Sequence, residues 1–85
     1  MPMNKEWVLW NLKEAQEELI RTIADLESDA SYDVPEFSVA MSHLYHHLNT
    51  AWNSRDVSEE VARDCSQENF DRWRQMPDDI NLATE

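Results

Sequence analysis

The absence of glycine constrains this chain more than any other feature, because none of its 85 residues is a glycine. Tight hairpin turns and phosphate-binding loops depend on glycine for positive φ angles and for close approach of the backbone to a ligand. P-loop and dinucleotide-binding motifs are therefore excluded, and a β-rich fold is disfavoured. We predict an all-α fold.

Apolar residues recur in steps of three and four along the first half of the chain, as on one face of a helix. A first helix is expected from an N-cap at Asn4 to about Ser28. After a polar loop, a second helix opens near Asp33 or Val34 and ends near Ser54. The residues expected to face the core are Val8, Leu12, Ala15, Leu19, Ile23 and Leu26, then Phe37, Met41, Leu44, Leu48 and Ala51.

A third, shorter helix is expected from Glu59 to about Gln75, with Ser58 as its N-cap and Pro77 beyond its end. Ser66 lies inside this span and could either break the helix or restart it, and the sequence leaves both alternatives open. The residues expected to face inward are Val61, Ala62, Cys65, Trp73 and Met76.

These elements predict one helical domain over residues 1–77, followed by a flexible acidic tail over 78–85. Three helices of unequal length pack poorly alone, and a short chain buries only a modest share of its surface. We expect the two long helices to form an antiparallel hairpin whose open apolar edge meets a second copy. The expected assembly is a homodimer that completes a four-helix-type bundle.

The charge balance favours some partners over others. The chain has 18 acidic residues and only seven Lys and Arg, which gives a formal net charge of −11. A field of this sign repels phosphate backbones, so we expect no binding to nucleic acid. It favours solubility and would attract a basic protein partner. Cys65 is the only cysteine, which excludes an internal disulfide, and no apolar run is long enough for a membrane span. The expected location is the cytoplasm.

All three histidines lie in the second predicted helix, at positions 43, 46 and 47. His43 and His47 are four residues apart and point the same way, so they could share a metal, whereas His46 is expected near the opposite side of the helix. Two histidines are fewer ligands than zinc normally takes, and acids of the first helix or a second chain would have to supply the others. The favoured interpretation is three surface or boundary histidines, with no metal and no cofactor.

Aromatic and amide side chains on the other flank of this helix resemble a contact surface, because they bury area while keeping hydrogen-bonding tips. Trp10 of the first helix lies nearly opposite its apolar stripe, and exposed tryptophans are enriched at binding hot spots. An alternative is that Tyr45 and Trp52 only close the edge of the core. The candidate interaction surface consists of Trp10, Tyr45, Asn49, Trp52 and Arg55.

Residues 10–20 (WNLKEAQEELI) and 37–48 (FSVAMSHLYHHL) resemble the first two helices of DinB-type four-helix bundles. That resemblance implies a metal-binding histidine on the second helix, matched here by His46 or His47, and two more on a later helix. This chain has no histidine after position 47, so only a dimerising half-bundle would fit.

The acids Glu14, Glu17 and Glu18, with the run Leu44-Tyr45-His46, are also similar to all-α nucleotide pyrophosphatases. Such enzymes need a carboxylate on the later helix to share magnesium, and Ser42 stands where it would be expected.

The sequence thus predicts a small, acidic, non-catalytic helical protein that acts through protein–protein interaction. Three alternatives stay open: a DinB-like half-bundle with a metal held by His43 and His47 at a dimer interface, an acidic inhibitor that mimics nucleic acid and blocks a basic protein, and a degenerate pyrophosphatase.

Overall fold

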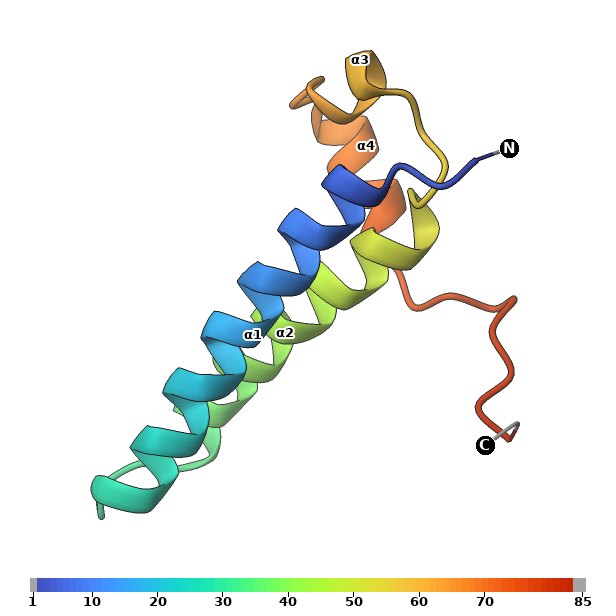
Figure 1. Ribbon diagram of the computed structural model, residues 1–85. Coiled ribbons are helices and arrows are strands. Elements are labelled where there is room, and N and C mark those ends of the chain that lie inside the picture. Colours follow the sequence, from blue (N-terminus) through green and yellow to red (C-terminus); the bar gives the residue numbers. More distant parts are fainter. Residues whose placement is uncertain (1, 84–85) are drawn as a thin grey trace.

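The computed structural model describes residues 2–83 and is helical throughout its regular structure (Figure 1). Two long helices, α1 (Lys5–Ser28) and α2 (Val34–Asn53), are followed by two short ones, α3 (Glu59–Ala62) and α4 (Gln67–Trp73). No strand occurs within residues 2–83. The predicted all-α class is confirmed, and so are the bounds of the two long helices.

The start of α1 is fixed by its predicted cap. The Asn4 side-chain oxygen accepts a hydrogen bond from the backbone N–H of Trp7 at 3.1 Å, which satisfies one of the free donors at the helix start. The same side chain donates to the Val57 carbonyl at 3.0 Å, and the Asn4 backbone N–H donates to the Arg55 carbonyl at 2.7 Å. The cap therefore also ties the start of α1 to the loop after α2.

The helix ends are built without glycine. No residue within 2–83 has a positive φ angle, so the left-handed termination that glycine normally supplies is not used. Instead α1 ends at the capping residue Asp29, whose backbone is extended with a φ angle of −114°. α2 begins with a capping box in which Asp33 and Glu36 each accept a hydrogen bond from the other's backbone.

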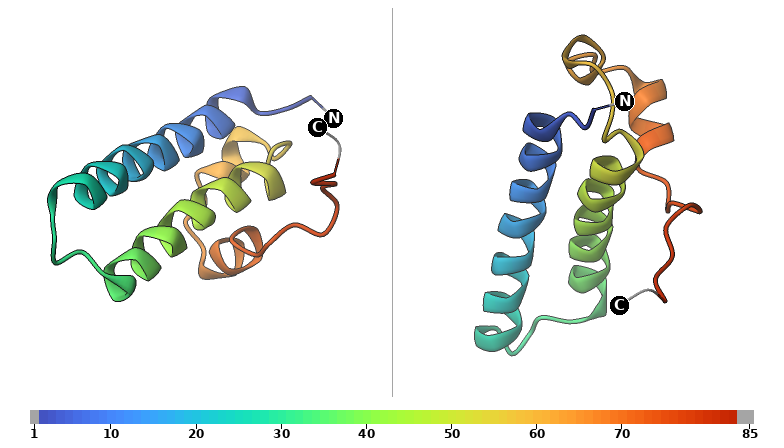
Figure 2. Two further views of the ribbon diagram at one scale, coloured as in Figure 1. Left: turned by 90° about the horizontal axis from the view of Figure 1, so that it is seen from below. Right: turned by 45° about the vertical axis from the view of Figure 1, so that its right-hand side comes forward.

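α1 and α2 lie side by side as an antiparallel hairpin (Figure 2), but the face they bury differs from the predicted one. In α1 the buried residues are Asn11, Ala15, Glu18 and Thr22. Of the predicted core stripe only Ala15 is buried in the single chain, and Leu12, Leu19 and Ile23 are 44%, 45% and 49% exposed. We call the line along which α1 contacts α2 the contact line. It is rotated about a quarter turn or less around the helix axis from the apolar stripe, toward the row of polar residues that contains Asn11, Glu18 and Thr22.

The same rotation holds in α2. Ala51 is buried as predicted, together with Ala40 and His47, whereas Phe37 and Leu48 of the predicted stripe are exposed. The prediction placed the centre of the interface at the centre of the apolar stripe. Small residues let two helices approach closely, so the observed contact runs along Ala15 and Ala40 instead.

The third predicted helix is broken. Its first part, α3, is capped by the Ser58 side chain, and its second part, α4, begins at Ser66, whose hydroxyl accepts from the Asn69 backbone N–H at 3.2 Å. The alternative left open at Ser66 is decided in favour of a restart. Of the residues expected to face inward, Trp73 is buried, while Val61, Cys65 and Met76 are exposed.

α4 packs against the end of α2, on one side of the hairpin (Figure 2). The buried Trp73 ring meets the Trp7 ring edge-on, with centroids 6.1 Å apart. Phe70 packs on the ring of His46 at 4.7 Å. The far half of the hairpin has no second layer, and the radius of gyration is 14.7 Å, against about 12 Å for a compact chain of this length.

Candidate functional site

A connected row of polar side chains occupies the interface between α1 and α2. Glu18 of α1 accepts hydrogen bonds from Arg21 at 2.8 Å and from Thr22 at 3.0 Å. The same carboxylate lies 2.7 Å from Nδ1 of His43 in α2. Its side chain is only 7% exposed, so a buried negative charge here depends on these three partners.

The pKa of Glu18 follows from this environment. Burial by itself would raise the pKa of the carboxyl group, but hydrogen bonds from Arg21, His43 and Thr22 outweigh that effect and lower it to about 2. Glu18 is therefore ionised at neutral pH and can only accept hydrogen bonds. It follows that His43 donates through Nδ1–H.

His47 has a similar arrangement one turn further along α2. Its Nδ1 lies 3.1 Å from the side-chain oxygen of Asn11, and the Asn11 amide nitrogen donates to the Trp7 carbonyl at 3.1 Å. That second bond fixes the amide orientation, so the oxygen faces His47, which also donates through Nδ1–H. Burial, followed by the charges of His46 and His43, lowers the pKa of His47 to about 4.

The two Nε2 atoms of His43 and His47 face each other at 3.1 Å. The predicted common orientation of these two histidines is thus observed. Within residues 2–83, no group of three or more His, Cys, Asp and Glu side chains is arranged to hold a metal ion. Glu18 contacts His43 from behind and does not converge on the Nε2 atoms.

The expectation that His46 lies apart from the other histidines is wrong. Its ring centroid is 4.7 Å from that of His47, and its other face meets Phe70. The distance is short because His46 and His47 are consecutive residues of α2, so their side chains start only about 100° apart around the helix axis. Burial, followed by the charges of His43 and Arg74, lowers the pKa of His46.

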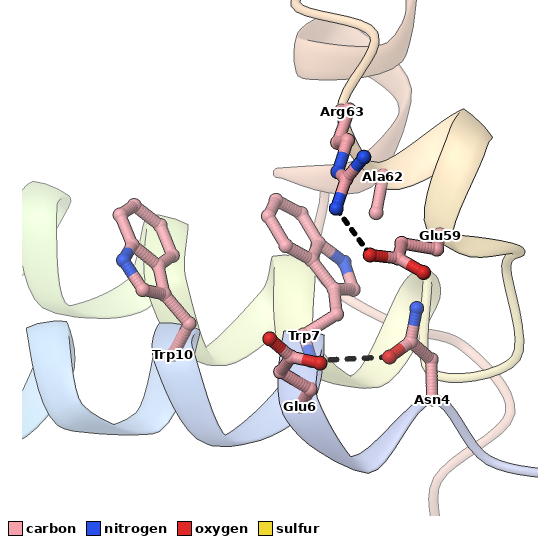
Figure 3. Close-up of a pocket in the computed structure, with 7 residues that line it drawn as sticks. All are labelled: Asn4, Glu6, Trp7, Trp10, Glu59, Ala62 and Arg63. Atoms are coloured by element: carbon pink, nitrogen blue, oxygen red, sulfur yellow. Dashed lines mark hydrogen bonds and ion pairs between the residues drawn. The ribbon is translucent and has the colours of Figure 1, made fainter.

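Trp10, the first residue of the predicted interaction surface, is 51% exposed and stacks on Trp7 with ring centroids 5.8 Å apart. Figure 3 shows the two indoles side by side along α1, with the ion pair between Glu59 and Arg63 beside Trp7. A cavity of about 210 Å³ lies between these groups and is open to solvent. Trp10 also meets the ring of His47, at 5.9 Å.

The other residues of the predicted surface lie on α2 and just after it. Asn49 is buried and donates to the Arg74 carbonyl at 3.0 Å. Trp52 donates to Asp79 at 2.7 Å, and the Arg55 guanidinium lies over the Trp52 ring at 4.0 Å. These three side chains hold the segment after α4 against α2, while Tyr45 is exposed.

The five residues are therefore divided between two places. Trp10 lies beside His47, whereas Trp52 and Arg55 contact Asp79 in the segment that was predicted to be a flexible tail. Residues 84 and 85 of that predicted tail lie outside the described residues.

Sequence reasoning missed the polar row itself. Asn11, Ala15, Glu18 and Thr22 recur in steps of four, three and four, which is the spacing of one helix face. This regular spacing of polar residues beside the apolar stripe was the signal that could have revealed them.

No protein-family model, curated protein or solved structure matches this chain. Among the described residues, no helix combines the length and the apolar character needed to cross a membrane.

Proposed function

We propose that this protein is a self-associating helical interaction module, in which two copies pair through one open apolar face of the α1–α2 hairpin. The observation that supports the proposal is that the apolar stripes of both long helices are half-exposed or exposed in the single chain. We define the open apolar face by its residues: Val8, Leu12, Leu19, Ile23 and Leu26 of α1, with Phe37, Met41, Leu44 and Leu48 of α2.

Helix geometry places both stripes on the same side of the hairpin. In α1 the apolar stripe is displaced around the helix axis from the buried row that contains Ala15, in the sense in which the helix winds from N- to C-terminus. In α2 the apolar stripe is displaced in the same sense from the buried row that contains Ala40. Because the helices are antiparallel, equal rotations from the contact line lead to one common side. α4 lies on the opposite side, where it contacts Trp7 and His46.

The position of the acidic residues supports close approach of two copies despite the net charge. At about 100° per residue, no Asp or Glu of α1 or α2 falls inside the arc that the open apolar face spans around each helix axis, although the chain carries 18 acidic residues. Glu18, Asp25 and Glu36 instead line a hollow on the other side of the hairpin, together with Arg21. Acids are thus kept from the one surface that a second acidic copy would have to contact.

A second copy is the occupant that best fits this face. A two-helix layer pairing with its own image through a twofold axis gives a four-helix bundle, a stable way to bury one apolar face of a hairpin. From Val8 to Leu26 the stripe extends for about 27 Å of helix. Each half-exposed Leu or Ile would gain about 1 kcal/mol on burial. A second copy packed on the open apolar face would also account for the elongated shape of the single chain, because the hairpin would then be only half of the bundle.

The test compares two neighbouring substitutions of equal charge, Ile23→Glu on the open apolar face and Ala24→Glu, which points away from α2. Sedimentation velocity at micromolar concentration should show a dimer for the natural chain and for Ala24→Glu, and a folded monomer for Ile23→Glu. Circular dichroism checks that both variants keep their helices. A natural chain that sediments as a monomer, or a dimer that survives Ile23→Glu unchanged, would contradict the proposal.

A further inference from the structure

We propose that His43 and His47 bind one divalent transition-metal ion through their Nε2 atoms, with zinc, copper or nickel as the chemical class. The inference goes beyond self-association, because this pair lies on the polar side of the hairpin and not on the open apolar face. It rests on the hydrogen bonds that fix both rings and on the distance between the two nitrogens.

The proton positions follow from the partners of the two rings. Nδ1 of His43 lies 2.7 Å from a carboxylate oxygen of Glu18, and this hydrogen bond places hydrogen on Nδ1. The Asn11 oxygen faces Nδ1 of His47 because its amide nitrogen is already used by the Trp7 carbonyl. With hydrogen on both Nδ1 atoms, the two Nε2 atoms are left to share the gap of 3.1 Å between the rings. Two lone pairs repel each other at this distance, and either a proton or a metal ion bound between the nitrogens removes that repulsion.

The spacing of the nitrogens fits one shared metal ion. Zinc binds imidazole nitrogen at about 2.0–2.1 Å, so two such ligands in a tetrahedral site lie about 3.3 Å apart. The observed 3.1 Å needs only a small ring adjustment. Imidazole nitrogen is a suitable ligand for zinc, copper and nickel, whereas magnesium and calcium prefer oxygen.

The groups behind the two histidines match the outer shell of a metal site. Metal-binding histidines commonly donate their other N–H to a carboxylate or an amide oxygen, which sets the tautomer and the ring orientation. Glu18 does this for His43 and Asn11 does it for His47. The His43 side chain is 42% exposed, so water can supply the remaining ligands. With two protein ligands, we expect weaker binding than in structural zinc sites, which have four.

The experiment is native mass spectrometry and calorimetry of the full chain titrated with zinc chloride alone, after chelator treatment and dialysis. The expected result is one zinc per chain. His43→Gln and His47→Gln should each lower the affinity at least tenfold, while His46→Gln, on the same helix but outside the pair, should leave it within about threefold. Glu18→Gln should weaken binding by about tenfold or more.

His47 is buried and its variant could fail to fold, so circular dichroism accompanies every titration, and the half-exposed His43 provides an independent variant. Absence of a stoichiometric zinc adduct in the natural chain would overturn the proposal. Equal loss of binding in His46→Gln would do the same. So would nitrogen NMR spectra that show the pair sharing a proton unchanged by added zinc, which would assign the site to a proton only.

Discussion

At the scale of single residues, this hairpin is unusual because its tightest contacts are polar. Asn11, Glu18, Thr22 and His47 are all buried, and hydrogen bonds satisfy each of them. A buried polar group left without a partner costs about 1–3 kcal/mol, so the row is stable only when all its members are in register. It therefore specifies how α1 aligns with α2, which apolar side chains alone would leave less defined.

The lowered pKa values of His47 and Glu18 predict that stability falls as the pH is lowered. Below pH 6.5 the unfolded chain binds a proton at His47 that the folded chain does not bind until about pH 4. Glu18 adds a second loss between its ordinary value of 4.5 and about 2. With chelator present, the free energy of unfolding should therefore decrease from pH 6.5 to pH 4, by at most about 1.4 kcal/mol per pH unit for one proton.

Urea unfolding at fixed protein concentration measures this slope. His47→Gln should flatten it between pH 6.5 and pH 4, whereas Tyr45→Phe, a change at an exposed position of the same helix, should not. If the slope stays the same in His47→Gln, the loss of stability between pH 6.5 and pH 4 does not come from protonation of His47.

At the scale of the elements, α4 is too short to be stable by itself and depends on its attachment to the hairpin. Trp73 packs on Trp7, and two amide side chains of α2, Asn49 and Asn53, donate to the carbonyls of Arg74, Trp73 and Gln75. The chain after Ser66 is thus held by two aromatic contacts, Trp73 on Trp7 and Phe70 on His46, and by hydrogen bonds from side chains of α2.

This attachment predicts unequal effects for the two aromatic residues of α4. Trp73→Ala should destabilise the fold by about 3–5 kcal/mol or detach α4, because a buried aromatic ring is lost. Phe70→Ala should cost clearly less, since Phe70 is half exposed. Amide hydrogen exchange over residues 67–73 is the measurement. Equal protection in both variants would show that the ring of Trp73 does not hold α4.

At the scale of the whole molecule, an acidic chain with an open apolar face combines an attraction and a repulsion. Burial of the open apolar face favours pairing, whereas two copies of net charge −11 repel each other over the distance that salt leaves unscreened. The balance between these effects decides at which concentration the proposed dimer forms.

This balance predicts that added salt strengthens self-association. Between about 0.05 M and about 0.5 M sodium chloride the dimer dissociation constant should fall several-fold, because screening removes repulsion and leaves apolar burial intact. The melting temperature should also rise with protein concentration, as mass action requires for a folded dimer. Sedimentation equilibrium and thermal unfolding at two salt concentrations test both points. A dimer that weakens with salt would indicate pairing through opposite charges instead.

The sequence by itself determined the two long helices and their ends, and it left open whether the third predicted helix breaks at Ser66. The caps bond backbone groups three residues away, and one of them, Asp33, also bonds its neighbour, so the information is local. The capping residues are Asn4, Asp33, Ser58 and Ser66. It also placed His43 and His47 on one side of α2, because a spacing of four is a property of any helix. Glu18 was one of three acids considered, and spacing gave no means to select it.

Only the tertiary structure decided which face of each helix is buried and what the histidines contact. The apolar stripe and the polar row of α1 lie next to each other, and a small rotation of the helix exchanges them. That rotation depends on how closely Ala15 and Ala40 allow the two helices to approach each other. The distance of approach is a property of the pair of helices and cannot be inferred from the sequence of either helix alone. The partnership of Glu18 with His43 joins residues 25 positions apart, so it too is a product of packing between helices.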